Sequence, residues 1–300
     1  MNEGNSTLIR LPPKLNQNDT DQLVKVVRAD EPEELARQGI IDAQIMSRVL
    51  RRGQTFAQYR ILGFVASGGM GEIYAAERLE DDGPRRRPVA LKVVSPEHLH
   101  DPSIIGRLER EAQLAASVFS KHTVGIYEYG VASGRGFVAM EFLFGEELFG
   151  RMRTHKVLPL KELAELAVSM LIGLEDIHGA EIVHRDIKPE NIFLSKTRRG
   201  EVVKILDFGI ARKFNDDDDP LLSKPGQIFG TPQYLSPEQC VSFMVDHRSD
   251  LYSLGVVLYE CAAGNPPFDR DTPWATMLAH QQEPVPLLPS TLDKIGRAHV

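Results

Sequence analysis

The sequence has few of the residues that stabilise disulfide-rich or zinc-binding proteins. Its only cysteines are Cys240 and Cys261, and their spacing fits neither a CxxC motif nor a set of metal ligands. This argues against a disulfide framework and a zinc site, and favours a reduced, cytoplasmic protein. The chain also has no apolar run of about eighteen residues, and residues 1–13 lack a basic stretch followed by an apolar core. These absences exclude a membrane-spanning helix and a signal peptide within this sequence.

Charge of one sign is not in large excess either. Lys and Arg number 35 against 42 Asp and Glu, so the formal net charge is -7. Because nucleic-acid binding usually draws on a basic surplus, this balance argues against nucleic acid as the main partner. The basic run Arg85–Arg87 and the acidic run Asp216–Asp219 are interpreted as solvated loops. A hydrophobic share of 42% is enough for one two-lobed core or two small domains.

What the sequence does contain is two motifs with concentrated chemistry. The first, HRDIKPEN at residues 184–191, places Asp186, Lys188 and Asn191 directly after an apolar segment. The second follows another apolar run and begins at Asp207, in the tripeptide DFG. Phosphoryl transfer needs such groups: a carboxylate to accept the proton of the attacking hydroxyl, a cation near the moving phosphoryl group, and oxygen ligands for magnesium.

Both motifs resemble the catalytic-loop and metal-binding signatures of the protein kinase superfamily. The resemblance implies that Asp186 is the catalytic base and that Lys188 lies near the γ-phosphate. It implies that Asn191 and Asp207 bind Mg²⁺, and that ATP and Mg²⁺ are the cofactors. The alternative, in which Asp186 only caps a turn, is disfavoured because Asn191 follows five positions later in the same loop.

A glycine-rich turn lies between two predicted strands, 59–65 and 72–77, and a third strand is predicted at 88–94. A glycine cluster alone is more often an ordinary hairpin turn. Here Gly68 and Gly71 match the second and third glycines of the family's phosphate-covering loop, whereas Ala66 stands where the family has its first glycine. Glycines let main-chain N–H groups approach phosphate oxygens without interference from Cβ.

Lys92 lies in the third predicted strand among apolar neighbours, where an unpaired cation is costly. Glu111 falls on the apolar face of a helix predicted near 104–117. An ion pair between them satisfies both side chains, and the family uses that pair to hold the lysine against the α- and β-phosphates. A surface lysine and a purely structural ion pair are the alternatives.

A short apolar strand predicted at Phe137–Glu141 resembles the hinge of the family. The resemblance makes Met140 the gatekeeper and places the main chain of Glu141 and Leu143 at the adenine edge. Without the resemblance, the apolar residues on these strands would be interpreted as core residues. The implied nucleotide site consists of Val65, Ala66, Gly68, Gly71, Ile73, Ala90, Lys92, Met140, Glu141, Leu143 and Phe193.

The segment after Asp207 resembles an activation loop. Lys188 together with Gly230–Pro232 is typical of serine/threonine rather than tyrosine kinases. Family members with an arginine at the position of Arg185 are commonly activated when a phosphate on this loop pairs with it. Ser223 is the candidate phosphorylation site, with an ordinary surface serine as the alternative.

The predicted fold is α+β and two-lobed, with a small antiparallel-sheet N-lobe containing one helix and a larger, mainly helical C-lobe. Helices are predicted at 160–178, 246–260 and 274–281, and the resemblance implies that Asp250 braces the catalytic loop. The last six residues match the translation of a widely used sequencing adapter, so the natural chain is expected to continue past Lys294. The predicted organisation is a disordered tail at 1–20, a short helical leader at 21–58, an N-lobe at 59–141, an incomplete C-lobe at 142–294 and an adapter-derived end at 295–300.

The whole pattern is similar to bacterial serine/threonine kinases. It implies transfer of the ATP γ-phosphate to Ser and Thr hydroxyls of protein substrates, with self-association for trans-autophosphorylation. The alternatives are a nucleotide-binding pseudokinase or scaffold, and an interaction protein that acts through the leader. Membrane attachment through a region beyond Lys294 is left open.

Overall fold

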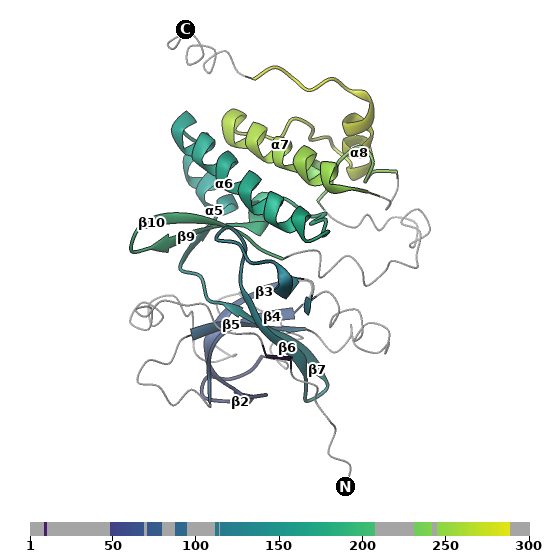
Figure 1. Ribbon diagram of the computed structural model, residues 1–300. Coiled ribbons are helices and arrows are strands. Elements are labelled where there is room, and N and C mark those ends of the chain that lie inside the picture. The colour runs from purple at the N-terminus through teal and green to yellow at the C-terminus, as the bar shows by residue number, and fades with distance from the viewer. Residues whose placement is uncertain are drawn as a thin grey trace. The chain divides into compact units, whose positions relative to one another are not determined.

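The computed structural model describes residues 9–10, 49–68, 71–79, 88–94, 112–113, 115–207, 231–241 and 245–288. The chain divides into two compact units, one of Met1–Ser117 with Gly125–Phe144 and one of Val118–Val124 with Gly145–Val300. Strands make up most of the described part of the first unit, and the long helices of the described residues belong to the second (Figure 1). The predicted α+β class is confirmed by this composition.

The first unit is built on a seven-stranded antiparallel sheet with the strand order β1-β6-β7-β5-β4-β3-β2. The strands predicted from alternating apolar residues and glycine-rich turns correspond to β3, β4, β5 and β7. The strand bounds are β1 Ile9–Arg10, β2 Thr55–Phe56, β3 Tyr59–Gly68, β4 Gly71–Arg78, β5 Pro88–Val94, β6 Ile126–Ala132 and β7 Arg135–Glu141.

The sheet includes a strand that the sequence did not predict. Ile9 and Arg10 of β1 pair with Tyr129 and Glu128 of β6. Both residues lie within 1–20, for which disorder was predicted, so the structure differs from the prediction at these two positions. The edge of β6 offers main-chain N–H and C=O groups to which even a polar segment can pair.

The core of the first unit extends beyond the predicted kinase lobe. Leu50 and Phe56 are less than 10% exposed and belong to the same apolar cluster as Phe137. The rings of Phe56 and Phe137 meet edge to face with centroids 5.9 Å apart, a geometry worth about 1 kcal/mol beyond its buried area. The main-chain N–H of Leu50 donates to the buried hydroxyl of Tyr74 at 3.0 Å. The leader at 21–58 was predicted to be helical, and this is wrong at Val49 and Leu50, because both residues are non-helical and packed on the sheet.

The second unit combines helices with a three-stranded antiparallel sheet in the order β10-β9-β8. Figure 1 shows α6 and α7 side by side, and α6 also packs against β10. The three predicted helices correspond to α6, α7 and α8, whereas α5 and β8 were not predicted. The bounds are β8 Gly145–Glu147, α5 Leu148–His155, α6 Leu160–Gly179, the 3-10 turn η2 Pro189–Asn191, β9 Ile192–Thr197, β10 Gly200–Ile205, the 3-10 turn η4 Pro232–Tyr234, α7 His247–Ala263 and α8 Pro273–Gln282.

Both ends of α7 carry the residues that favour a helix boundary. The Asp246 side chain accepts a hydrogen bond from the main-chain N–H of Arg248 at 2.9 Å, which caps the first turn. Gly264 ends the helix in the left-handed region, with φ at 86°, where residues with a Cβ are disfavoured. The position of Asp250 in the first turn of α7 is therefore defined locally.

Several predictions fall on residues outside the described ranges. They are most of the predicted tail at 1–20, the part of the leader before residue 49, most of the helix predicted near 104–117, the segment 208–230 and the adapter-derived end at 295–300. No helix within the described ranges is both long and apolar enough to span a membrane.

Gly71 gives a test of the sheet geometry. Its φ is 143°, and a Cβ at this position would collide with the carbonyl oxygen of Val93 on the neighbouring strand β5. We expect Gly71→Ala to lower the free energy of unfolding by about 3 kcal/mol, because clash and backbone strain add. Gly134 also has a positive φ, 71°, but nothing lies within 4 Å of the position that a Cβ would take there.

The matched control is therefore Gly134→Ala, for which only the strain of about 1 kcal/mol is expected. Urea unfolding of the two variants and of the unmodified chain measures the difference. Equal destabilisation by both substitutions would contradict the predicted clash at Gly71.

Candidate active site

The loop at residues 184–191 is held by the carboxylate of Asp250. Asp250 is completely buried, and its Oδ2 and Oδ1 accept hydrogen bonds from the main-chain N–H groups of His184 at 2.8 Å and Arg185 at 2.7 Å. Nε2 of His178, on α6, lies 2.8 Å from Oδ2. A buried carboxylate is costly unless its oxygens are bonded, and these three contacts supply the partners. The contacts expected of Asp250 as a brace of the loop are therefore present.

His184 ties the same loop to the end of β10. Its ring Nε2 lies 2.7 Å from the carbonyl oxygen of Leu206, and its Nδ1 accepts from the main-chain N–H of Asp186 at 3.3 Å. The main-chain N–H of Leu206 also donates to the carbonyl oxygen of Asn191 at 2.9 Å. Two bonds therefore fix the residue that directly precedes Asp207.

Three predicted site residues are in direct contact within this loop. Oδ2 of Asp186 lies 2.9 Å from Nζ of Lys188. Nδ2 of Asn191 donates to the same oxygen at 2.9 Å and to the main-chain oxygen of Asp186 at 2.7 Å. Asp186 remains 27% exposed at its side chain. A carboxylate in this position is oriented by two donors and still accessible to a hydroxyl group.

Backbone strain is concentrated around the same residues. Arg185 and Asp207 both have positive φ angles, 66° and 47°, although neither is glycine. Such conformations cost about 1–3 kcal/mol each and persist where the surroundings over-determine them. The bonds from Asp250 to Arg185 and from the loop to Leu206 supply that constraint.

The donor set suits a hard cation. Asn191 uses Nδ2 for both contacts with Asp186, so its amide oxygen Oδ1 is the atom suited to a metal. Burial, and after it the negative charges of Glu190 and Asp207, raises the pKa of the Glu147 carboxyl. These acids share a negative potential that a divalent cation bound by oxygen ligands would neutralise. In the described part of the chain, no group of three or more His, Cys, Asp or Glu side chains is arranged so that it could hold a metal ion.

The predicted phosphate-binding and adenine-binding residues of the first unit share one region of its sheet. Ala66 of β3 pairs with Ile73 of β4, and Ile73 pairs with Lys92 of β5. Directly paired residues point to the same face of a sheet. Ala90 pairs with Met140 on β7, two positions from Lys92 and therefore on that face too. Around Lys92, which is 8% exposed, this face carries the apolar side chains of Ile73, Ala90 and Met140.

The residues predicted to form the hinge lie at the end of β7. The main-chain N–H of Glu141 donates to the carbonyl oxygen of Gly125 at 2.7 Å, and Glu141 is paired with Val89 of β5. Leu143 follows in a non-helical segment and is half-buried. Phe193 belongs to the second unit, on β9 opposite Glu147.

Two predicted functional residues lie outside the described ranges, Glu111 and Ser223. The ion pair of Lys92 with Glu111 and the phosphorylation of Ser223 therefore stay predictions. Val65, Gly68 and Gly71 are within the described strands β3 and β4.

The sequence prediction missed the residues that support the loop. His178 contacts Asp250, and Nε2 of Gln239 donates to the carbonyl oxygen of Arg185 at 2.9 Å. No local pattern marks either residue, because each acts across many positions of sequence. The position of His178 in the last turn of α6, shortly before the catalytic motif, was the one available signal.

Comparisons with known proteins agree with this geometry. The model of the protein kinase domain matches residues 59–293. The chain is 40% identical over 237 residues to the serine/threonine-protein kinase pkn2 of Myxococcus xanthus, covering 77% of this chain and 27% of that protein. It is 37% identical over 244 residues to pkn3 of the same organism, covering 78% and 43%.

A solved structure shows the same fold. The kinase domain of PknI from Mycobacterium tuberculosis aligns with a TM-score of 0.59 and 28% identity, covering 75% of this chain and 82% of that chain. The chain spans less than half the length of the two Myxococcus relatives. The resemblance to protein kinases predicted from the two motifs is confirmed, and the chain belongs to the protein kinase family.

Proposed function

We propose that this chain is the catalytic domain of a serine/threonine protein kinase, which transfers the γ-phosphate of ATP to Ser or Thr hydroxyls of proteins. Members of the family use ATP and a divalent metal ion, and we propose Mg²⁺ here. One observation carries the proposal: the Asp186 carboxylate contacts Lys188 and Asn191 in a loop fixed by a buried acid. Relatives named as serine/threonine kinases support the choice of hydroxyl acceptor.

The residues of this loop suit in-line transfer. Asp186 orients the acceptor hydroxyl and takes its proton while the oxygen attacks the γ-phosphorus and the bond to the leaving ADP oxygen breaks. Lys188 balances the negative charge that spreads over the phosphoryl oxygens, and Lys92 is assigned to the α- and β-phosphates. Oδ1 of Asn191 and the carboxylate of Asp207 would hold the metal ion, which supplies charge neutralisation and orientation of the phosphates when bound.

The nucleotide site proposed in the first unit comprises the glycine-rich turn, Lys92 and the hinge. The half-buried Ile73 and Ala90 next to Lys92 fit an aromatic ring better than a charged group. We also propose a cytoplasmic location, where ATP is available. The buried free thiols of Cys240 and Cys261 suit that reducing compartment.

Replacement of the proposed base tests the chemistry. Asp186→Asn keeps the size of the side chain but cannot accept the proton, so transfer is expected to fall by about 10²- to 10⁴-fold. Radiolabelled ATP and a protein substrate measure it. Asp176→Asn on α6 is the matched control, because Asp176 is exposed.

The control is expected to keep full activity. Comparable signals from the unmodified chain and from Asp186→Asn would instead favour a nucleotide-binding scaffold without turnover.

Replacement of the bracing acid separates positioning from chemistry. In Asp250→Asn one carboxylate oxygen becomes an N–H₂ group that faces the main-chain N–H donors of the loop. Loss of such charge-assisted bonds costs about 2 kcal/mol, so we expect a lower thermal midpoint together with a lower kcat.

The KM for ATP is expected to change little, because Asp250 bonds the loop and not the proposed nucleotide site. Asp271→Asn, at an exposed position, is the control. Unchanged stability and kcat in Asp250→Asn would contradict the bracing role.

We propose that the active chain phosphorylates itself at Ser223, in trans between two copies, and that the phosphate pairs with Arg185. Phosphopeptide mass spectrometry of active protein should find the modification, and Ser223→Ala should reduce activity toward a second substrate. An unmodified Ser223 in fully active protein would contradict this proposal.

A further inference from the structure

The last part of the leader, residues 49–58, is attached to the sheet of the first unit, and we call this segment the leader end. The main-chain N–H of Gly53 donates to the carbonyl oxygen of Ile61 at 2.8 Å, and the N–H of Ile61 donates to the carbonyl oxygen of Gln54 at 2.9 Å. The strand β2 follows and pairs with β3. The match to the protein kinase domain begins at residue 59, so the leader end lies before the matched domain.

Two side chains of the leader end are anchored in the core. Leu50 is 8% exposed and Phe56 is 4% exposed, and both belong to an apolar cluster formed with β4, β5 and β7. The members of the cluster on these three strands are Tyr74, Ala76, Val89, Leu91, Val93, Phe137 and Ala139. The leader end therefore packs on strands that also carry proposed nucleotide-binding residues.

The register places the leader end and the proposed nucleotide site on opposite faces of the sheet. In one row across β4, β5 and β7, Tyr74 pairs with Leu91, and Leu91 pairs with Ala139. In the adjacent row, Ile73 pairs with Lys92. Successive residues of a strand point to opposite faces, so the cluster around Tyr74 lies on the face opposite to Ile73 and Lys92. The packing of the leader end therefore bears on the nucleotide site through the strands themselves.

Polar contacts connect the leader end to the start of β4. The main-chain N–H of Leu50 donates to the hydroxyl of Tyr74 at 3.0 Å, and Tyr74 is completely buried. Glu72, on the same face as Tyr74, is 2% exposed and forms an ion pair with Arg135 of β7. Buried polar and charged groups are costly unless their partners stay in place. Glu72 and Tyr74 flank Ile73, so these contacts fix the stretch of strand from which Ile73 projects.

We propose that the leader end is a positioning element for the nucleotide site, with Leu50 and Phe56 as its anchors. The anchors hold β4 and β5 in the arrangement that binds the nucleotide, although both lie on the opposite face. Without them the cluster loses volume, and the strands adopt positions in which Ile73 and Lys92 are displaced. The apparent affinity falls with the fraction of molecules in the binding arrangement, so a fraction of about one tenth weakens binding about tenfold.

The effect is expected on nucleotide binding and not on transfer, and the inference rests on the nucleotide site of the proposed function. The described members of the cluster all belong to the first unit, whereas Asp186 belongs to the second. Saturating nucleotide selects the binding arrangement and restores its population. A raised KM for ATP with an unchanged kcat therefore distinguishes positioning from a loss of folded protein, which lowers the rate at every ATP concentration.

Direct nucleotide binding by the full chain tests the proposal. The probe is ADP with a fluorescent N-methylanthraniloyl group on its ribose, titrated in the presence of Mg²⁺ at a temperature below the unfolding of every variant. In Leu50→Ala the dissociation constant and the KM for ATP are expected to rise about tenfold, with kcat within about twofold. Leu50→Met keeps the apolar volume and is expected to restore the affinity of the unmodified chain.

A milder variant tests the same connection without a cavity. Tyr74→Phe removes the hydroxyl that accepts from Leu50 and leaves the ring in the cluster. Its dissociation constant for the probe is expected to rise about threefold. This variant decides the question if Leu50→Ala does not fold, and thermal unfolding of each protein checks the fold.

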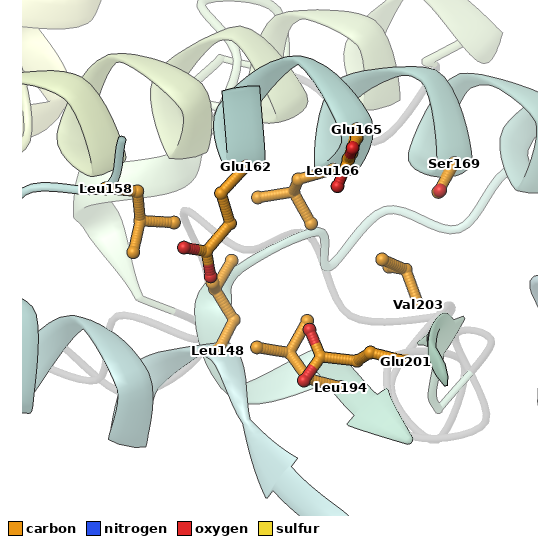
Figure 2. Close-up of a pocket in the computed structure, with 9 residues that line it drawn as sticks. All are labelled: Leu148, Leu158, Glu162, Glu165, Leu166, Ser169, Leu194, Glu201 and Val203. Carbon is orange, nitrogen blue, oxygen red and sulfur yellow. The ribbon is translucent and has the colours of Figure 1, made fainter. Parts of the chain in front are cut away.

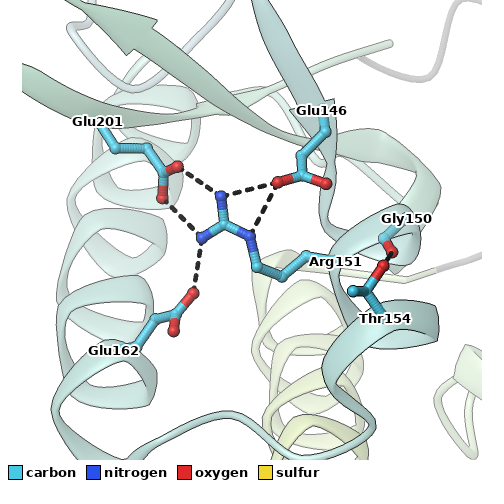
Figure 3. A network of polar contacts seen from close by, with 6 residues as sticks. All are labelled: Glu146, Gly150, Arg151, Thr154, Glu162 and Glu201. Atoms are coloured by element: carbon cyan, nitrogen blue, oxygen red, sulfur yellow. Dashed lines mark hydrogen bonds and ion pairs between the residues drawn. The ribbon is translucent and has the colours of Figure 1, made fainter.

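Two substitutions in the second unit are the matched controls. Leu166→Ala makes the same change as Leu50→Ala at a buried leucine of α6, which lines the hollow shown in Figure 2. Arg151→Met removes a guanidinium that joins α5 to carboxylates of β8, α6 and β10 (Figure 3). Both are expected to lower the thermal midpoint and to bind the probe like the unmodified chain.

The outcomes separate this inference from the proposed kinase activity. Equal affinity of Leu50→Ala, Tyr74→Phe and the unmodified chain would overturn the positioning role, and so would an equal loss of affinity in the two controls. An unmodified chain that binds no probe would overturn the proposed nucleotide site and this inference with it. Binding without transfer would contradict the kinase activity alone, because the dissociation constants would still decide the role of the leader end.

Discussion

The proposed active site depends on the buried carboxylate of Asp250. A loop with three polar functional side chains does not hold one conformation by packing, because those side chains must remain accessible. Asp250 provides the constraint through its bonds to two consecutive N–H groups and to His178. The bonds link α6, α7 and the loop, so the position of the Asp186 carboxylate is set by helix packing. The positive φ of Arg185 is maintained by the same contacts.

The sequence predicted the elements whose residues follow a clear period. The alternation at 59–65 lies within β3, and the helical period at 160–178 corresponds closely to α6. It failed where tertiary packing decides the structure. Leu50 and Phe56 lack a periodic context and are buried in a cluster that includes Phe137, which lies far along the chain. The short elements β8 and α5 were missed since three to eight residues carry too little pattern.

For the site, the motifs predicted which side chains matter, and the structure adds how they are oriented. HRDIKPEN marks Asp186, Lys188 and Asn191 by residue type and spacing alone. The contacts that fix them are not readable locally: Gln239 reaches Arg185, and His184 reaches Leu206, across 54 and 22 positions. Contacts of this range depend on how α6, β10 and α7 pack, and no spacing rule encodes that packing.

The strand β8 carries two acids with different partners. Successive residues of a strand point to opposite faces. Glu146 bonds Arg151, which also contacts Glu162 of α6 and Glu201 of β10, whereas the pKa of Glu147 is raised by burial and, after it, by Glu190 and Asp207. One acid of the strand therefore ties α5 to its neighbouring elements, and the other adds to the negative potential near the proposed metal ligands, without a shared side chain.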